Sequence, residues 1–248
     1  MEKRPLLNTF INNLTMGETV SIIEKMILSP KKSYIVAVNV DVIVKIENDS
    51  YLKTIVDNAD MVLVDGKPLV WIAKLYGRPI KAKISGSDLV PSLCRVAAEK
   101  AYTIFIIGGK NGIAEQAKKC LEKEFPQIQI VGTYSPPFGF ENNQRELELI
   151  NKKISSVHPD LLIACFGCPK QEKWIYENMS KYDAKVSVCA GATVDFLAGN
   201  VKRAPKWMSA CGLEWFYRFL QEPQRLFKRY FIDDVKILKL IYKYWNLR

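Results

Sequence analysis

Short apolar runs alternate with longer amphipathic segments along most of this chain. The runs are YIVAV (34–38), MVLV (61–64), TIFII (103–107), IQIV (128–131), LLIACF (161–166) and KVSVC (185–189). Continuous apolar runs of this length are typical of strands that are buried on both faces of a parallel sheet. The segments between them, such as 88–100, 112–124, 141–155 and 169–180, have helical spacing. The alternation predicts an α/β fold with a doubly wound, Rossmann-like, mostly parallel sheet.

Positive charge is concentrated near the C-terminal end. The 248 residues carry a net charge of +10, and residues 201–248 contain eleven Lys or Arg against four Asp or Glu. That segment therefore holds +7 of the total, which leaves +3 for residues 1–200. It is also rich in aromatic residues. We predict an α/β domain over residues 1–200 and a basic, aromatic-rich helical appendage over residues 201–248.

The appendage contains a predicted amphipathic helix over residues 223–245. Basic residues at 225, 229, 236 and 243 stand beside an apolar stripe at 227, 231, 238, 241 and 245. This pattern fits a helix that lies in a membrane interface and contacts anionic lipids. A helix packed on its own domain, or a contact in a homo-oligomer, fits the pattern equally well.

Targeting and membrane-spanning signals are not evident in the sequence. The first fifteen residues are interrupted by Pro and Asn and do not resemble a secretory signal. No run approaches the roughly 18 apolar residues of a spanning helix. The six cysteines are scattered, and the Cys165–Cys168 pair lacks a second pair of metal ligands, so we interpret them as reduced thiols that mostly fill the core. These features predict a cytoplasmic protein.

Small and polar residues follow the predicted strands, at the edge of the sheet where α/β proteins bind ligands. They include Asn39, Asp65-Gly66, Gly108-Gly109 and Lys170-Gln171. Glycines there let backbone N–H groups approach a phosphate, so a diphosphate ligand fits. The Gly108-Gly109-Lys110 run matches neither the dinucleotide fingerprint nor the P-loop, and each loop alone is also compatible with ordinary turns.

Several longer motifs resemble the WecG/TagA/CpsF glycosyltransferases. They are Gly86-Ser87-Asp88-Leu89, the run 136–140 (PPFGF), the run 168–175 (CPKQEKWI), Asp195-Phe196-Leu197-Ala198-Gly199, the run 203–208 (RAPKWM) and the run 212–215 (GLEW) followed by Arg218 and Glu222-Pro223. The resemblance extends from Asn39 to Tyr230. It implies a metal-independent, inverting enzyme without a cofactor, whose catalytic domain is residues 1–200. No nucleic acid partner is implied.

The resemblance also implies the substrates. Family members transfer a sugar from a UDP-sugar to a polyprenyl-diphosphate-linked sugar at the inner face of the cell membrane, so we expect peripheral association with that surface. Our first expectation for the sugar is N-acetylmannosamine or its uronic acid, for teichoic acid or another surface polysaccharide; glucose transfer for capsule or exopolysaccharide is the alternative. Ala37, Val40 and Lys83 depart from the residues common in the family, which leaves the donor open.

An inverting transfer needs a base for the acceptor hydroxyl and positive charge for the departing diphosphate. Asp65 is the predicted base, because it directly follows a buried strand and matches the family's catalytic aspartate; a helix N-cap is its structural alternative. No Asp-x-Asp metal signature occurs. The predicted diphosphate ligands are therefore arginines of the appendage, namely Arg218, Arg225 and Arg229. Arg203 is a further candidate of lower rank.

The remaining predicted substrate contacts come from the sheet edge. Asn39, Gln171 and the Gly108-Gly109 backbone would hold the uridine and the sugar, while Gly66, Ser87 and Lys170 complete the set. Asp88 fits a sugar contact or a helix cap equally well. Two other classes stay open from the residues alone: a nucleotide-dependent oxidoreductase, and a non-enzymatic binder of anionic lipid or RNA.

Overall fold

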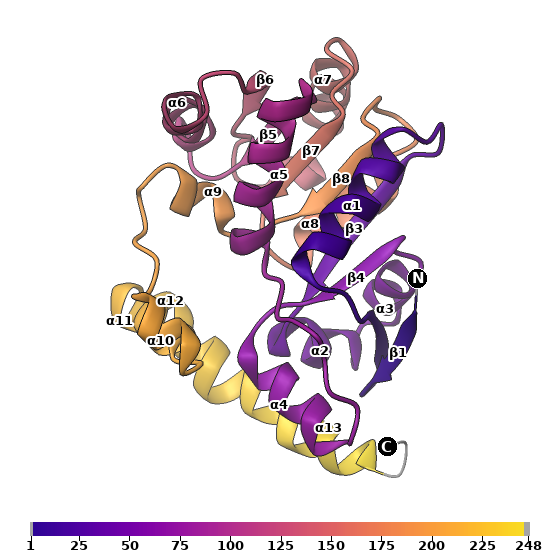
Figure 1. The fold of residues 1–248 in the computed structure, drawn as a ribbon, viewed down its shortest axis with the longest axis vertical. Coiled ribbons are helices and arrows are strands. Elements are labelled where there is room, and N and C mark those ends of the chain that lie inside the picture. Colours follow the sequence, from indigo (N-terminus) through magenta and orange to yellow (C-terminus); the bar gives the residue numbers. More distant parts are fainter. Residues whose placement is uncertain (1, 246–248) are drawn as a thin grey trace.

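The computed structural model describes residues 2–245, and its central feature is a parallel sheet of six strands (Figure 1). The strands are β3 (Ser33–Val38), β4 (Met61–Val64), β5 (Thr103–Gly108), β6 (Gln129–Tyr134), β7 (Leu161–Cys165) and β8 (Val186–Cys189). Their order across the sheet is β4-β3-β8-β7-β5-β6. Each predicted apolar run forms one of these strands, which confirms the predicted α/β class.

Helices cover both faces of the sheet, each over its own apolar cluster. One cluster contains side chains of α1 (Met16–Ile27), α5 (Gly86–Lys100), α6 (Ile113–Glu124) and α9 (Thr193–Leu197). The other contains side chains of α2 (Val40–Ile46), α3 (Ser50–Asp57), α4 (Lys67–Leu75), α7 (Gln144–Ser155) and α8 (Lys170–Asn178). Successive strand residues point to opposite faces, so Ile106 joins the first cluster and Ile107 the second. Each such fully buried side chain contributes about 1.5–3 kcal/mol.

An N-terminal hairpin stands outside the main sheet, and the sequence did not predict it. Strands β1 (Lys3–Leu6) and β2 (Thr9–Asn12) pair antiparallel. The buried Asn12 accepts a hydrogen bond from the Val62 N–H at 2.7 Å, and Asn13 accepts one from the Lys81 N–H at 2.8 Å. These asparagines therefore satisfy backbone groups of the main domain rather than interrupting the N-terminal segment.

The appendage is a chain of short helices that runs along one side of the molecule (Figure 1). It comprises α10 (Lys206–Ala210), α11 (Glu214–Gln221), α12 (Pro223–Lys228), a π-helical turn η2 (Arg229–Asp233), a 3₁₀ turn η3 (Asp234–Lys236) and α13 (Ile237–Lys243). The segment expected as one helix over 223–245 is thus helical but changes its hydrogen-bond pattern at the π turn. Such turns interrupt α-helices frequently at functional sites.

The last helix packs against the main domain. The Tyr76 hydroxyl donates to the Ile241 carbonyl at 2.7 Å, and the rings of Tyr76 and Trp245 meet edge to face at 5.8 Å. Leu240 is buried in the second cluster, and Tyr244 donates to the Glu47 carboxylate. These contacts fix α13 against α2 and α4, which Figure 1 shows side by side with it.

The apolar stripe predicted for membrane contact divides into two parts. Ile241 and Trp245 pack against the second cluster, as expected for a helix docked on its own domain. Phe227, Phe231 and Leu238 are exposed, with 64% of Leu238 accessible. Within residues 2–245, no helix has both the length and the apolar character needed to cross a bilayer.

Candidate active site

A cavity of about 980 Å³ lies between the carboxyl ends of the strands and the appendage. Eight of the thirteen predicted site residues line it: Asn39, Asp65, Gly66, Ser87, Gln171, Arg218, Arg225 and Arg229. The other five, Asp88, Gly108, Gly109, Lys170 and Arg203, lie outside this lining. The cavity thus has one wall from the sheet edge and one wall from the basic appendage.

Strand order explains which loops reach the cavity. Its lining includes residues that follow β3, β4, β7 and β8, the four neighbouring strands at one side of the sheet. Strand β5 lies beyond β7, next to β6, so the Gly108-Gly109 loop is displaced from the cavity. Backbone packing, and not a ligand contact in the cavity, accounts for the glycine at position 108, because a Cβ there would lie 2.4 Å from the Cys165 carbonyl oxygen.

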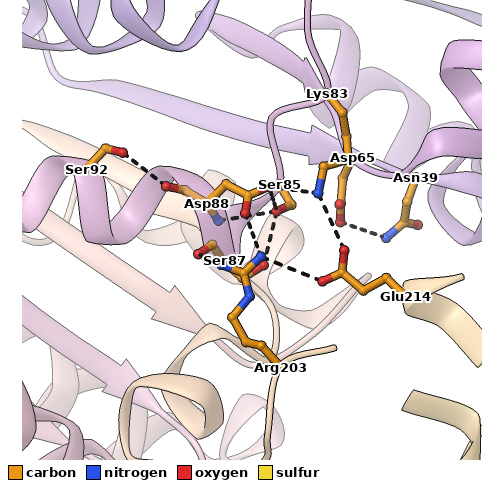
Figure 2. Close-up of polar contacts among 9 residues, drawn as sticks. All are labelled: Asn39, Asp65, Lys83, Ser85, Ser87, Asp88, Ser92, Arg203 and Glu214. Carbon is orange, nitrogen blue, oxygen red and sulfur yellow. Dashed lines mark hydrogen bonds and ion pairs between the residues drawn. The ribbon is translucent and has the colours of Figure 1, made fainter. Parts of the chain in front are cut away.

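Asp65 follows β4 and lines the cavity, and Figure 2 shows its carboxylate beside the Asn39 side chain. Its backbone N–H donates to the Val38 carbonyl at 2.7 Å, which continues the pairing of β4 with β3. Its carboxylate has one side-chain contact, from the Asn39 amide nitrogen at 3.5 Å. The N-cap of α4 is Gly66, with no side-chain capping bond, so Asp65 is not engaged as a helix cap.

Burial raises the pKa of the Asp65 carboxyl, and the nearby Glu214 carboxylate acts in the same direction. Lys83, Asn39 and Arg218 oppose this effect without cancelling it. A carboxylate whose pKa is raised binds a proton more strongly at neutral pH than an ordinary aspartate. The position and the electrostatics of Asp65 therefore suit a general base.

Asn39 is held so that its amide nitrogen faces Asp65. It is the N-cap of α2, and its side-chain oxygen accepts the Val42 N–H at 3.1 Å. This bond leaves the amide N–H₂ group for Asp65 and for the cavity. A single side chain thus orders the loop after β3 and contacts the carboxylate after β4.

An ion-pair cluster joins the main domain to the appendage (Figure 2). Lys83 lies 2.7 Å from Asp88 and 3.5 Å from Glu214, and Arg203 lies 2.5 Å from Asp88. Burial alone would raise the pKa of Asp88, but hydrogen bonds from Lys83, Ser85 and Arg203 lower it to about 2. Asp88 is therefore a charged structural group, placed outside the cavity lining.

Lys83 and Glu214 had no role predicted from the sequence. Glu214 lines the cavity, and both residues act on the pKa of Asp65. They are 131 positions apart in the chain and meet only because the appendage folds over the sheet edge. The one available signal was the acidic Glu214 within the Gly-Leu-Glu-Trp motif of a basic segment.

Gln171 connects the loops that follow β7 and β8. Its side-chain oxygen accepts the Gly167 N–H at 3.2 Å and the Gly191 N–H at 3.0 Å. Its neighbour Lys170 points elsewhere, to the Glu141 carboxylate at 2.6 Å and to the Phe138 ring at 5.2 Å. Gln171 therefore shapes the cavity wall through backbone groups, and Lys170 belongs to a separate cluster.

The three cavity-lining arginines of the appendage have different partners. Arg225 pairs with Glu222, and Arg229 lies 3.6 Å from Asp41 and 3.8 Å from Asp234. Arg218 stacks over the Phe196 ring at 5.4 Å, and its buried Nε has no hydrogen-bond partner in the described part of the chain. The Arg229 Nε also lacks a hydrogen-bond partner there, so what sets Arg218 apart is that it is the one of the three guanidinium groups without an ion pair among the described residues.

The cysteines supply no metal site or disulfide in this structure. All six are free thiols, and burial raises the pKa of Cys165 to about 12. Across residues 2–245, no cluster of three or more His, Cys, Asp or Glu side chains is arranged to hold a metal ion. The buried thiols act as apolar filler.

A doubly wound sheet with a cavity at its carboxyl edge is the architecture of many nucleotide-binding enzymes, and comparison with known proteins identifies which kind this is. The chain belongs to the glycosyl transferase WecG/TagA/CpsF family, whose model matches residues 4–248. This assignment confirms the predicted family and enzyme class and decides against the oxidoreductase and the non-enzymatic binder.

Two curated relatives are similar over almost the whole chain. Both are named N-acetylglucosaminyldiphosphoundecaprenol N-acetyl-beta-D-mannosaminyltransferase. The protein from Bacillus spizizenii (strain W23) is 30% identical over 226 residues, which cover 91% of this chain and 86% of the relative. The protein from Bacillus subtilis (strain 168) is 28% identical with the same coverage.

Proposed function

We propose that this glycosyltransferase moves N-acetylmannosamine from a UDP-sugar to N-acetylglucosamine carried on a polyprenyl diphosphate, in the synthesis of a cell-wall polymer. The names of the two Bacillus relatives support the transferred sugar and the acceptor. The volume of the cavity supports a ligand as large as a nucleotide sugar. The observation that carries the proposal is that Asp65 and Arg218 reach the same cavity from opposite walls.

In the proposed mechanism Asp65 is the base. Its carboxylate takes the proton of the acceptor hydroxyl while that oxygen attacks the anomeric carbon of the donor sugar. The bond from that carbon to the UDP oxygen breaks on the opposite face, which inverts the configuration. Asn39, which donates toward Asp65 at 3.5 Å, keeps the carboxylate directed into the cavity.

Arg218 is the proposed ligand of the departing diphosphate. A guanidinium group binds two phosphate oxygens at once and stays charged at every physiological pH. Its partner-free Nε would gain a hydrogen bond when the diphosphate binds, and negative charge that develops on the leaving oxygen would strengthen that bond. Arg225 would assist only after loosening its pair with Glu222.

The acceptor places this reaction at a membrane surface. A polyprenyl chain stays in the bilayer, so its diphosphate-linked sugar has to be reached from the inner face. Phe227, Phe231 and Leu238 are exposed on the appendage, which also carries Arg218. We propose that these side chains rest in the membrane interface and that basic residues contact anionic lipids.

The proposal is tested by incubating the protein with a panel of UDP-sugars and a short polyprenyl-diphosphate N-acetylglucosamine analogue, and measuring UDP release. We expect release with UDP-N-acetylmannosamine and not with the acceptor omitted. Release with UDP-glucose alone would replace the proposed donor by the glucose alternative. The absence of release with every donor would overturn the proposed function.

A further inference from the structure

Glu172 is one of the carboxyl groups that line the cavity, and it has no accessible surface. It lies in the first turn of α8, next to Gln171. Its Oε1 accepts a hydrogen bond from the Gln171 amide nitrogen at 2.8 Å, whereas its Oε2 has no hydrogen-bond partner within residues 2–245. A buried ionised carboxylate with one oxygen unpaired would be costly to the fold.

The surroundings of Glu172 favour its uncharged form. Burial raises the pKa of its carboxyl, and contacts with Gln171, Cys168 and Lys45 oppose this rise without cancelling it. The Lys45 ammonium is directed to the Asp41 carboxylate at 2.8 Å and to the Cys168 carbonyl at 2.9 Å. The ammonium group that acts on Glu172 is therefore already engaged with other acceptors.

Gln171 needs an acceptor on its nitrogen side. Its side-chain oxygen accepts hydrogen bonds from the Gly167 and Gly191 N–H groups. If the amide were rotated by 180°, its N–H₂ group would face these two donors, and neither would have an acceptor. The Glu172 Oε1 atom is the acceptor that holds the amide in the productive direction. Both glycines have positive φ angles, of 79° and 60°, so their loops depend on local contacts to keep that shape.

We propose that Glu172 is a positioning residue whose Oε1 atom fixes the Gln171 amide and thereby the shape of the two loops that receive the donor. Glu172 acts through Gln171, because it exposes no surface of its own to a ligand. The inference rests on the proposed function for its kinetic consequence, but the loop geometry itself does not depend on which sugar is transferred.

The experiment compares Glu172→Gln and Glu172→Leu in the full chain. The glutamine keeps an acceptor oxygen and carries no charge, and the leucine removes the acceptor. Glu177→Gln is the matched control, because Glu177 lies on the same helix and its carboxylate accepts a hydrogen bond from the hydroxyl of the exposed Tyr51 at 2.9 Å. Amide hydrogen exchange of residues 166–168 and 189–193 and the KM for the donor are the two readouts, with thermal melts as a check of folding.

We expect Glu172→Gln and the control to keep wild-type exchange protection and a donor KM within about threefold of wild type. Glu172→Leu should lose protection in both loops and raise the donor KM at least about tenfold, with a smaller change in kcat. If Glu172→Leu does not fold, Gln171→Leu replaces it and should show both effects, the loss of exchange protection in the two loops and the rise in the donor KM.

Two results would overturn the inference: unchanged loop exchange in Glu172→Leu, or a loss in Glu172→Gln as large as in Glu172→Leu, which would mean that the charge is needed. If wild type released no UDP with any donor, the proposed function would fail, and the exchange readout alone would still decide the role of Glu172.

Discussion

The guanidinium of Arg229 lies 3.6 Å from the Asp41 carboxylate, and this pair joins the π turn of the appendage to the first turn of α2. Asp41 is 6% exposed and also receives the Lys45 ammonium. Asp234 approaches Arg229 from the other side at 3.8 Å. Arg229, predicted as a diphosphate ligand, thus has a structural use as the contact that holds the appendage on the main domain.

Arg229→Ala should therefore loosen the docked appendage. The change leaves Asp41 and Asp234 without their shared cation, so the free energy of unfolding should fall by about 1–3 kcal/mol. Urea denaturation measures the stability. Limited proteolysis measures the docking of the appendage on the main domain, and cleavage after residue 200 should become faster in the variant. A double-mutant cycle with Asp41→Asn should give a coupling free energy clearly above zero; simple additivity would contradict the contact.

Arg218→Ala should affect turnover far more than stability. Arg218 forms no ion pair in the described part of the chain and acts on Asp65 and Glu222 only at longer range, so its removal breaks no direct contact with a carboxylate, while the leaving diphosphate loses its cation. We expect kcat to fall about 10²–10³-fold. Arg218→Lys should recover part of the loss. Lys239→Ala, an exposed change on the same appendage, is the control and should leave kcat unchanged.

Asp65→Asn should abolish most activity without weakening the fold. Loss of the base should lower kcat about 10²–10⁴-fold. Burial raises the pKa of Asp65 in the folded state, so its contribution to stability is present below the unfolded pKa and is lost as pH rises through the folded value. The variant should therefore be at least as stable as wild type at pH 7.5. A marked drop in melting temperature would show that the carboxylate is structural.

The pH dependence of the wild-type reaction should follow the same carboxyl. The base has to be ionised, so kcat/KM should rise with pH through an apparent pKa above the ordinary aspartate range. Rate measurements between pH 4 and 9 under donor-limited conditions check this. The ascending limb should disappear in Asp65→Asn, and its persistence there would assign it to another group.

Asp88 should give the fold part of its acid sensitivity. Its pKa is lowered from 3.8 to about 2 by Lys83, Ser85 and Arg203, so its stabilising contribution is complete above about pH 4 and is lost as pH falls toward 2. Asp88→Asn should be less stable at pH 7, and the gap to wild type should shrink by up to about 2 kcal/mol on acidification. Denaturant titrations at both ends of this range test it, and a constant gap would contradict the ion-pair cluster.

The exposed part of the apolar stripe should govern binding to lipid. Replacing Phe227, Phe231 and Leu238 by serine should weaken sedimentation with vesicles that contain anionic lipid, because each side chain withdraws apolar area from the interface. Phe231 and Leu238 also line the cavity, so turnover is compared for Phe227→Ser alone, which should stay close to wild type on a short water-soluble acceptor. Equal loss of activity on soluble and membrane acceptors in this variant would show that Phe227 serves the cavity instead.

The sheet was predictable because each apolar run is a strand buried between two layers of helices. The β1–β2 hairpin was not predictable, because asparagines at its end hold it to the main domain by accepting hydrogen bonds from the distant Val62 and Lys81 N–H groups. Asp65 and Arg218 could be selected from strand position and from the family motifs. The positions of Gly108 and Gly109 could not be judged, since strand order is set by tertiary packing and no local signal encodes it.

The exposed part of the apolar stripe (Phe227, Phe231 and Leu238) and Arg218 belong to the same appendage, so the position of the protein on a membrane affects its kinetics. A protein held on a bilayer by these apolar side chains would meet its lipid-linked acceptor by lateral diffusion, without drawing the polyprenyl tail into water. Its rate would then follow the number of acceptor molecules per unit area of membrane. Dilution of the bulk solution at constant lipid composition would change the supply of the nucleotide sugar alone.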